Sequence, residues 1–136
     1  MIVTRQFALK FARYSIFLIY FWFGALKVAG ASSATPLVLA LLGKTISFME
    51  ANLFMTLFGL FEMFAGVLFL FPKLTRPAVY ISFLHIIVTF LPLLLLPDAA
   101  WQGILTPSLE GQYILKNILL ISVLLYLWTD IEASNA

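Results

Sequence analysis

Apolar residues fill four long stretches of this chain, and polar residues gather between them. Each stretch is close to the roughly 20 residues that a helix needs to cross the hydrocarbon core of a bilayer. The apolar runs are continuous, without the alternation that is typical of membrane β-strands. The pattern therefore predicts four transmembrane helices, at about residues 14–30, 51–71, 78–96 and 112–128.

Prolines and one shorter apolar stretch mark the segments between these helices. Pro72 and Pro77 flank the loop after the second helix, and Pro97 ends the third, as is common at helix boundaries. Residues 36–48 are apolar but too few to span a bilayer. They predict an interfacial or re-entrant helix in the first outer loop, and an ordinary apolar loop is the alternative.

The composition supports a membrane protein and excludes several classes of function. Of the 136 residues, 63% are hydrophobic and 10% are charged, whereas a soluble domain is about half apolar and about a quarter charged. The length fits a single domain, residues 1–136. Because the chain has no cysteine, thiol chemistry is excluded. With a formal charge of only +2 and no phosphate loop or nucleophile elbow, we expect no nucleic-acid partner and no enzyme acting on its own.

The basic residues predict how the chain is oriented. Arg5, Lys10 and Arg13 precede the first helix, and Lys73 and Arg76 lie between the second and the third. Cytoplasmic segments carry the excess of Lys and Arg in multi-pass proteins. We therefore expect both termini in the cytoplasm. A charged start before an apolar run also resembles a signal peptide, but this run is long, so we expect the first helix to be retained.

Polar and small residues recur at helical spacing within each predicted helix. Ionisable side chains are costly in hydrocarbon and by default face a bundle interior or a water-filled cavity. Residues three or four positions apart share one face of a helix. We therefore expect an all-α bundle of four helices around a polar interior. The four stripes are Arg13, Phe17, Tyr20, Gly24 and Lys27; Gly59, Glu62 and Gly66; Ser82, His85, Thr89 and Pro92; and Tyr113, Lys116, Asn117 and Leu120.

Depth along the helices separates the ionisable groups. At about 1.5 Å per residue, Glu62 lies near the midplane and His85 in the inner half of the membrane. Lys27 and Lys116 lie in the outer third, and Glu110 lies at the outer rim. We infer a cavity that opens outward, with basic walls and one buried carboxyl at its floor.

Each of these groups also has a purely structural interpretation. Glu62 is either a proton-accepting or ligand-anchoring group, or a carboxyl that is protonated or paired with Lys27 or Lys116 and fixes helix register. Both lysines could instead extend to the outer headgroups. For His85 we favour a hydrogen-bonded interior histidine. A zinc site would need more ligands than one His and one Glu, and a bis-histidine haem would need a second copy of the chain, so we predict no metal site.

Three segments resemble the DoxX-like superfamily of membrane proteins. In the first helix of that family an Arg opens the helix and Gly-x-x-Lys closes it, as in RYSIFLIYFWFGALK at residues 13–27. The second helix is similar to FGLFEMFAGVLFLFP, in which Gly66 follows Glu62 by four positions. The last helix resembles EGQYILKNILLI at residues 110–121. The pattern is nearest to the YkgB-like branch, which includes a reactive chlorine resistance membrane protein.

The resemblance implies a four-helix fold in the bacterial inner membrane and a role in redox or oxidative-stress systems. The superfamily includes a quinone-linked oxidoreductase subunit and partners of oxidative-defence enzymes. We therefore expect an accessory protein that binds a quinone or similar lipophilic molecule in its outward-facing cavity and serves a redox partner. The candidate residues for ligand binding or proton handling are Tyr20, Lys27, Glu62, His85, Glu110, Tyr113, Lys116 and Asn117.

Two other functions fit the same residues. One is a small carrier or channel for a solute, an ion or protons. Complete carriers usually contain repeats and more helices, so a four-helix chain would have to form at least a homodimer for this role. The other is a non-catalytic assembly factor, in which the polar interior only fixes the packing of the helices.

Overall fold

The computed structural model describes residues 4–135 of the chain. Within them, four helical segments are long and apolar enough to cross a membrane, at Arg5–Val28, Ala51–Leu68, Pro72–Leu95 and Leu109–Ala133. The prediction of four transmembrane helices is confirmed, and the chain is a multi-pass membrane protein. The elements in order are α1 (Arg5–Val28), α2 (Thr35–Thr45), α3 (Ala51–Leu68), the 3-10 helix η1 (Pro72–Leu74), α4 (Thr75–Phe90), α5 (Pro92–Leu95), α6 (Pro97–Ala100), β1 (Trp101–Gly103), β2 (Thr106–Pro107), α7 (Leu109–Leu115) and α8 (Asn117–Asn135).

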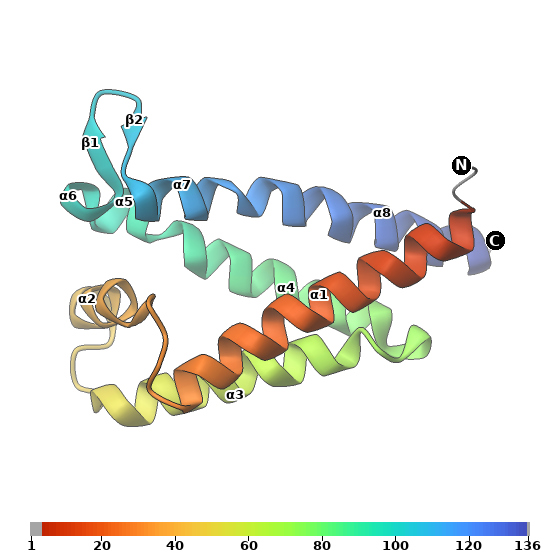
Figure 1. The fold of residues 1–136 in the computed structure, drawn as a ribbon, viewed down its shortest axis with the longest axis horizontal. Coiled ribbons are helices and arrows are strands. Elements are labelled where there is room, and N and C mark those ends of the chain that lie inside the picture. The colour runs from red at the N-terminus through yellow and green to blue at the C-terminus, as the bar shows by residue number, and fades with distance from the viewer. Residues whose placement is uncertain (1–3, 136) are drawn as a thin grey trace.

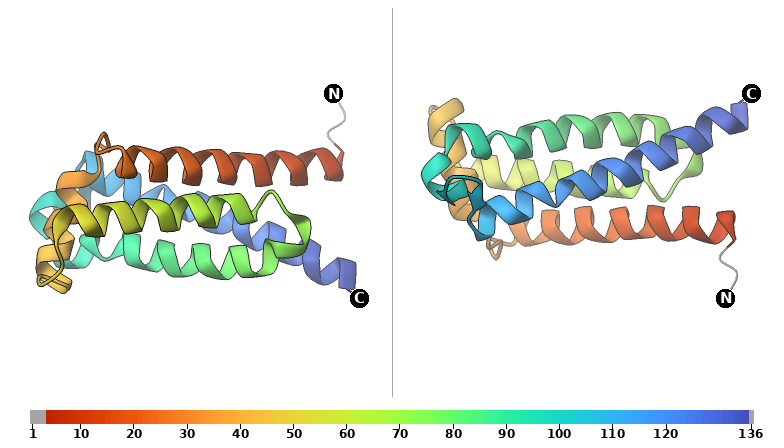
Figure 2. Two further views of the ribbon diagram at one scale, coloured as in Figure 1. Left: turned by 90° about the horizontal axis from the view of Figure 1, so that it is seen from below. Right: turned by 90° about the horizontal axis from the view of Figure 1, so that it is seen from above.

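The long helices lie side by side along the longest axis of the molecule (Figure 1). Both chain ends lie at one end of this axis, which we call the termini end and which also holds η1. The opposite end, here the hairpin end, carries α2, α6 and the antiparallel β1–β2 hairpin. Figure 2 shows α2 running across the ends of the long helices.

The membrane-length helices contact one another in a closed order. α1 packs against α3, α3 contacts α4, α4 packs against α8, and α8 contacts α1. The buried core lies between all four, because each of them contributes apolar side chains to one cluster. Its members are Ile16, Tyr20, Ala65, Leu68, Phe69, Ala78, Val79, Ile86, Leu124 and Leu127.

α1 and α3 approach so closely that their backbones touch. A Cβ atom added to Gly24 would lie 2.5 Å from the carbonyl oxygen of Gly59, and one added to Gly59 would lie 2.5 Å from that of Gly24. Gly66 packs in the same way against Tyr20. Small residues allow membrane helices to approach to backbone contact, and these glycines provide that approach between α1 and α3.

Several helix boundaries differ from the sequence prediction. α1 begins at Arg5 rather than near residue 14, because the Thr4 hydroxyl accepts a hydrogen bond from the Phe7 N–H and starts the helix early. α8 continues to Asn135, past the predicted end at 128. Hydropathy locates only the part of a helix that lies in hydrocarbon, and both of these extensions are polar.

The third and fourth membrane segments are interrupted. Pro92 has no N–H to donate, and regular helix gives way to a turn at Leu91, between α4 and α5. The fourth segment is broken at Lys116, between α7 and α8. Residues 35–45 form the helix α2, so the alternative of an irregular loop is wrong. The β1–β2 hairpin was not predicted, since its strands are only three and two residues long.

Candidate functional site

Four ionisable side chains form one hydrogen-bonded chain between α1, α3 and α4. Lys27 Nζ donates to Glu62 Oε2 at 2.7 Å. The other carboxylate oxygen, Glu62 Oε1, lies 3.1 Å from His85 Nε2. His85 Nδ1 in turn lies 3.1 Å from the Tyr20 hydroxyl. We call Tyr20, Lys27, Glu62 and His85 the polar chain.

The helices hold these side chains away from lipid. Tyr20 and Lys27 are seven positions apart, so they lie two turns apart on the same face of α1. Glu62 follows Gly59 by three positions on α3, so the backbone contact there aims it at α1. Residue exposure is 4% for Tyr20, 7% for Lys27 and 5% for Glu62. Lys27 therefore points inward to its partner, and its extension to the outer headgroups is ruled out.

The partners fix where the hydrogens of the polar chain lie. A carboxylate only accepts, so His85 Nε2 carries a hydrogen and donates to Glu62. With a neutral imidazole, Nδ1 is then the acceptor for the Tyr20 hydroxyl. When Lys27 and Glu62 are both ionised, this arrangement carries no net charge. A phenol, an imidazole and a carboxylate in series can pass a proton by successive shifts along their hydrogen bonds.

One end of the polar chain meets a hydroxyl that is not fully satisfied. Ser82 on α4 lies near the Tyr20 side chain, and its buried Oγ has no hydrogen-bond partner among residues 4–135. A buried polar atom without a partner is uncommon and calls for an explanation. The series of polar groups therefore extends past Tyr20 to a position that can accept or donate one more hydrogen bond.

Two phenylalanine rings flank the histidine, and neither belongs to the candidate residues named from the sequence. The Phe58 ring centroid lies 5.5 Å from that of His85 and 5.3 Å from Lys27 Nζ, a cation–π distance. The Phe61 ring lies 6.0 Å from the imidazole. Phe58 precedes Glu62 by four positions, so helical spacing could have placed it beside the carboxylate.

The remaining candidates lie outside the polar chain. Asn117 Nδ2 donates to Thr89 Oγ1 at 3.1 Å and links α8 to α4. Lys116 is exposed, and its Nζ lies 4.9 Å above the ring of Tyr113, which is 61% exposed. The prediction that Lys116 and Tyr113 face the interior is therefore wrong, because the buried residues of α7 are Gly111 and Ile114. Lys116 does not pair with Glu62.

Glu110 lies at the hairpin end, as expected, but in a different kind of pocket. A surface pocket of about 420 Å³ is lined there by Glu110, Asp98, Trp101 and residues of α2. Two carboxylates and no basic side chain line it, and Glu62 is not among its residues. We expected an outward-opening cavity with basic side chains on its walls and Glu62 at its floor. This pocket does not have that arrangement.

Glu50 also lies at the hairpin end, where it caps α3. Its carboxylate accepts hydrogen bonds from the backbone N–H groups of Asn52 at 2.9 Å and Leu53 at 2.6 Å. These two backbone hydrogen bonds hold the pKa of Glu50 below its usual value. The effect is structural, since Glu50 is exposed and lies outside the membrane-spanning part of α3.

Basic side chains at the termini end connect helices. Arg13 donates to the hydroxyl of Thr75, at the start of α4. Arg5 forms an ion pair with Asp130 of α8 at 2.6 Å. Arg13 thus joins α1 to α4, and Arg5 joins α1 to α8.

The described residues hold no obvious metal centre, and comparison gives no relative. In residues 4–135, no three His, Asp or Glu side chains group so as to hold a metal ion. No family model, curated protein or solved structure matches this chain. The site must therefore be interpreted from its own geometry and chemistry.

Proposed function

We propose that this protein is a DoxX-like protein of the bacterial inner membrane, a four-helix bundle with both termini in the cytoplasm. The three segments that resemble the superfamily support this, as do the closed order of helix contacts and the position of both chain ends at one end of the molecule. The termini end also holds Arg5, Lys10, Arg13, Lys73 and Arg76, which are five of the eight basic residues. Such an excess is typical of cytoplasmic segments.

Within this frame, the protein acts as an accessory subunit of a redox system, and its polar chain exchanges protons with a quinone or a similar lipophilic molecule. The single observation that carries this proposal is the buried series Lys27–Glu62–His85–Tyr20, which joins three helices inside the membrane. Ionisable groups at such depth are costly and typically mark proton or ligand pathways.

The residues around the polar chain suit such a ligand. A planar ring could stack on Phe58 or Phe61, both half-buried beside the imidazole. The imidazole of His85, whose side chain is 11% exposed, and the Tyr20 hydroxyl are the groups that could hydrogen-bond to a carbonyl oxygen. A quinone would supply two carbonyl groups that take up or release protons when electrons are transferred.

The proposal is tested by identifying the lipophilic molecules that co-purify with the full chain in mild detergent. We expect a stoichiometric quinone in the wild type and in Tyr113→Phe, whose hydroxyl lies outside the polar chain. Tyr20→Phe removes a single hydroxyl from the polar chain and should lower the bound amount. Absence of any such molecule, together with no binding of added quinone, would contradict the proposal.

One observation favours a second function, that of an assembly factor. The polar chain is internally paired, and it lies beside the backbone contact between Gly24 and Gly59. The role of such an interior can be limited to fixing the packing of the helices, without binding any ligand. In that case Tyr20→Phe and Glu62→Gln should change thermal stability or complex formation, and no ligand should be found in any variant.

A further inference from the structure

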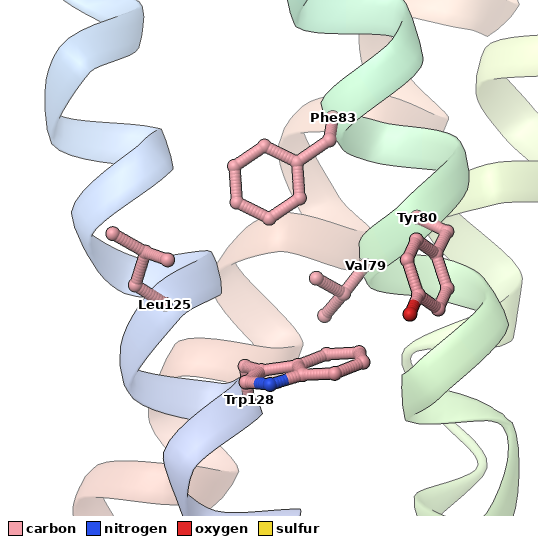
Figure 3. Close-up of a pocket in the computed structure, with 5 residues that line it drawn as sticks. All are labelled: Val79, Tyr80, Phe83, Leu125 and Trp128. Carbon is pink, nitrogen blue, oxygen red and sulfur yellow. The ribbon is translucent and has the colours of Figure 1, made fainter.

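A groove between α4 and α8 near the termini end has an almost entirely apolar lining. Its volume is about 150 Å³, and Val79, Tyr80, Phe83, Leu125 and Trp128 line it. Figure 3 shows the rings of Phe83 and Trp128 on either side of Val79, with Leu125 approaching from α8. The groove is open on one side, so hydrocarbon chains of the bilayer can reach it directly.

The indole N–H at this groove is already hydrogen-bonded to a neighbouring side chain. Trp128 Nε1 donates to Glu132 Oε1 at 2.8 Å, so the indole offers no donor to a ligand. The Tyr80 ring packs edge-on against Trp128 at 5.1 Å between centroids. A quinone ring would leave its carbonyl oxygens without partners here, which is costly in an apolar site. The groove therefore suits a plain hydrocarbon chain.

Positive charge lies at the margin of the same groove. The guanidinium of Arg76 lies 5.5 Å from the ring centroid of Trp128. Lys73 is three positions earlier, in η1. Among residues 4–135 neither of them forms an ion pair, unlike Arg5 and Lys27. Arg76, which has no ion-pair partner among residues 4–135, lies beside this apolar groove. A cation next to an apolar groove matches the chemistry of an anionic lipid, with its acyl chain next to its phosphate.

We propose that this groove is a binding site for an anionic phospholipid. One acyl chain lies between Phe83, Leu125 and Trp128, and the phosphate lies against Arg76 and Lys73. The site belongs to the leaflet at the termini end, which is the cytoplasmic leaflet in the proposed orientation. It does not depend on the proposed redox function, since it lies between α4 and α8 and shares no residue with the polar chain.

Native mass spectrometry of the full-length protein, titrated with phosphatidylglycerol or phosphatidylethanolamine of the same acyl chains, tests the site. The wild type should bind phosphatidylglycerol more tightly. Arg76→Gln should weaken that binding about fivefold, the factor expected for one basic residue at an anionic membrane surface. The control Lys10→Gln removes one positive charge from α1 at the termini end. It should change the affinity for phosphatidylglycerol by less than about twofold.

The apolar half of the site has its own pair of variants. Leu125→Trp fills the groove from its exposed rim and should weaken binding of both lipids. Leu119→Trp adds the same bulk to an exposed position of α8 outside the groove and should leave binding unchanged.

Three results would overturn the proposal. They are equal affinity of the wild type for the two lipids, equal losses in Arg76→Gln and Lys10→Gln, and a wild-type dimer that Leu125→Trp dissociates. The second result would mean a diffuse attraction to charge rather than a site. The third would mean that a second copy of the chain covers the groove.

Discussion

At the scale of single residues, the polar chain depends on the pairing of Glu62 with Lys27 rather than with Lys116. Helical spacing placed Tyr20, Lys27, Glu62 and His85 on inward faces, and the structure brings these four together. The spacing could not decide which lysine meets Glu62, because helix rotation and tilt are set by packing between helices. Lys116 has the same residue type and a similar depth, yet it is exposed and its Nζ lies over the Tyr113 ring.

The Lys27–Glu62 pair predicts strongly non-additive mutations. Lys27→Met leaves a buried carboxylate without its cation and should cost about 3–5 kcal/mol of unfolding free energy, as for other buried pairs that lose one partner. Replacing both residues by Met removes both charges and should cost less than either single substitution. Thermal unfolding of the two single variants and the double variant in one detergent measures this.

The hydrogen bond between His85 and Glu62 limits how much unfolding free energy the double variant regains. In the double variant His85 Nε2 loses its acceptor, so a residual cost of about 1–3 kcal/mol is expected. If the effects of the two single substitutions simply add, the two side chains do not interact, and the pairing described here is wrong.

At the scale of elements, long apolar runs were easy to predict, and their interruptions were not. Each predicted range overlaps one membrane-length helix, because about 20 consecutive apolar residues have few other stable arrangements. The turn at Leu91 and the break at Lys116 lie inside the predicted ranges 78–96 and 112–128. Hydropathy indicates whether a residue prefers an apolar environment, but it carries no information on backbone dihedral angles. The short β1–β2 hairpin likewise depends on local turn geometry.

The α1–α3 contact predicts a large difference between two glycine substitutions. Gly59→Ala places a methyl group against the Gly24 carbonyl and should destabilise the protein by about 1–3 kcal/mol, as overpacking does. Gly43→Ala is the matched control, because nothing lies within 4 Å of its added Cβ. It should be neutral or stabilising, since alanine favours helix. Unfolding midpoints of the two variants in detergent should therefore move in different directions, and equal shifts would contradict the close contact.

The cap of α3 predicts a dependence of stability on pH. Backbone hydrogen bonds lower the pKa of Glu50 in the folded protein, so its capping stabilises the fold above the unfolded pKa of about 4.3. This contribution is lost as the pH falls through the lower folded value. Between about pH 6 and about pH 3, the unfolding temperature should therefore drop less in Glu50→Gln than in the wild type.

Glu110→Gln is the control for this experiment. It removes a carboxylate from the same end of the molecule without removing a cap. Should Glu50→Gln follow the wild-type curve throughout, the capping hydrogen bonds make no contribution to stability.

At the scale of the whole molecule, the two ends differ in charge and in structure. The termini end holds five of the eight basic residues, and the hairpin end holds the acidic pocket, α2 and the hairpin. The hairpin tip presents Ile104 and Leu105, which are 96% and 88% exposed. Sequence reasoning predicted the charge asymmetry, because it needs only the positions of Lys and Arg between apolar runs.

The proposed orientation can be tested by labelling single cysteines, because the chain has none of its own. A membrane-impermeant maleimide added to intact cells should label Gln102→Cys, in β1 at the hairpin end. Lys73→Cys, in η1 at the termini end, should be labelled only after the membrane is opened. The opposite pattern would place the termini outside, and labelling of both in intact cells would rule out a spanning bundle.

The partnership of Lys27 with Glu62 also has a consequence for the order of biosynthesis. Lys27 leaves the ribosome 35 residues ahead of its partner. While α1 enters the bilayer alone, its lysine has no carboxylate to neutralise it, and a charged side chain in hydrocarbon costs several kcal/mol. The Lys27 ammonium group can stay at the outer headgroups until α3 inserts and then turn inward to Glu62. We therefore expect the insertion of α1 and α3 to be coupled, because the buried position of Lys27 requires Glu62.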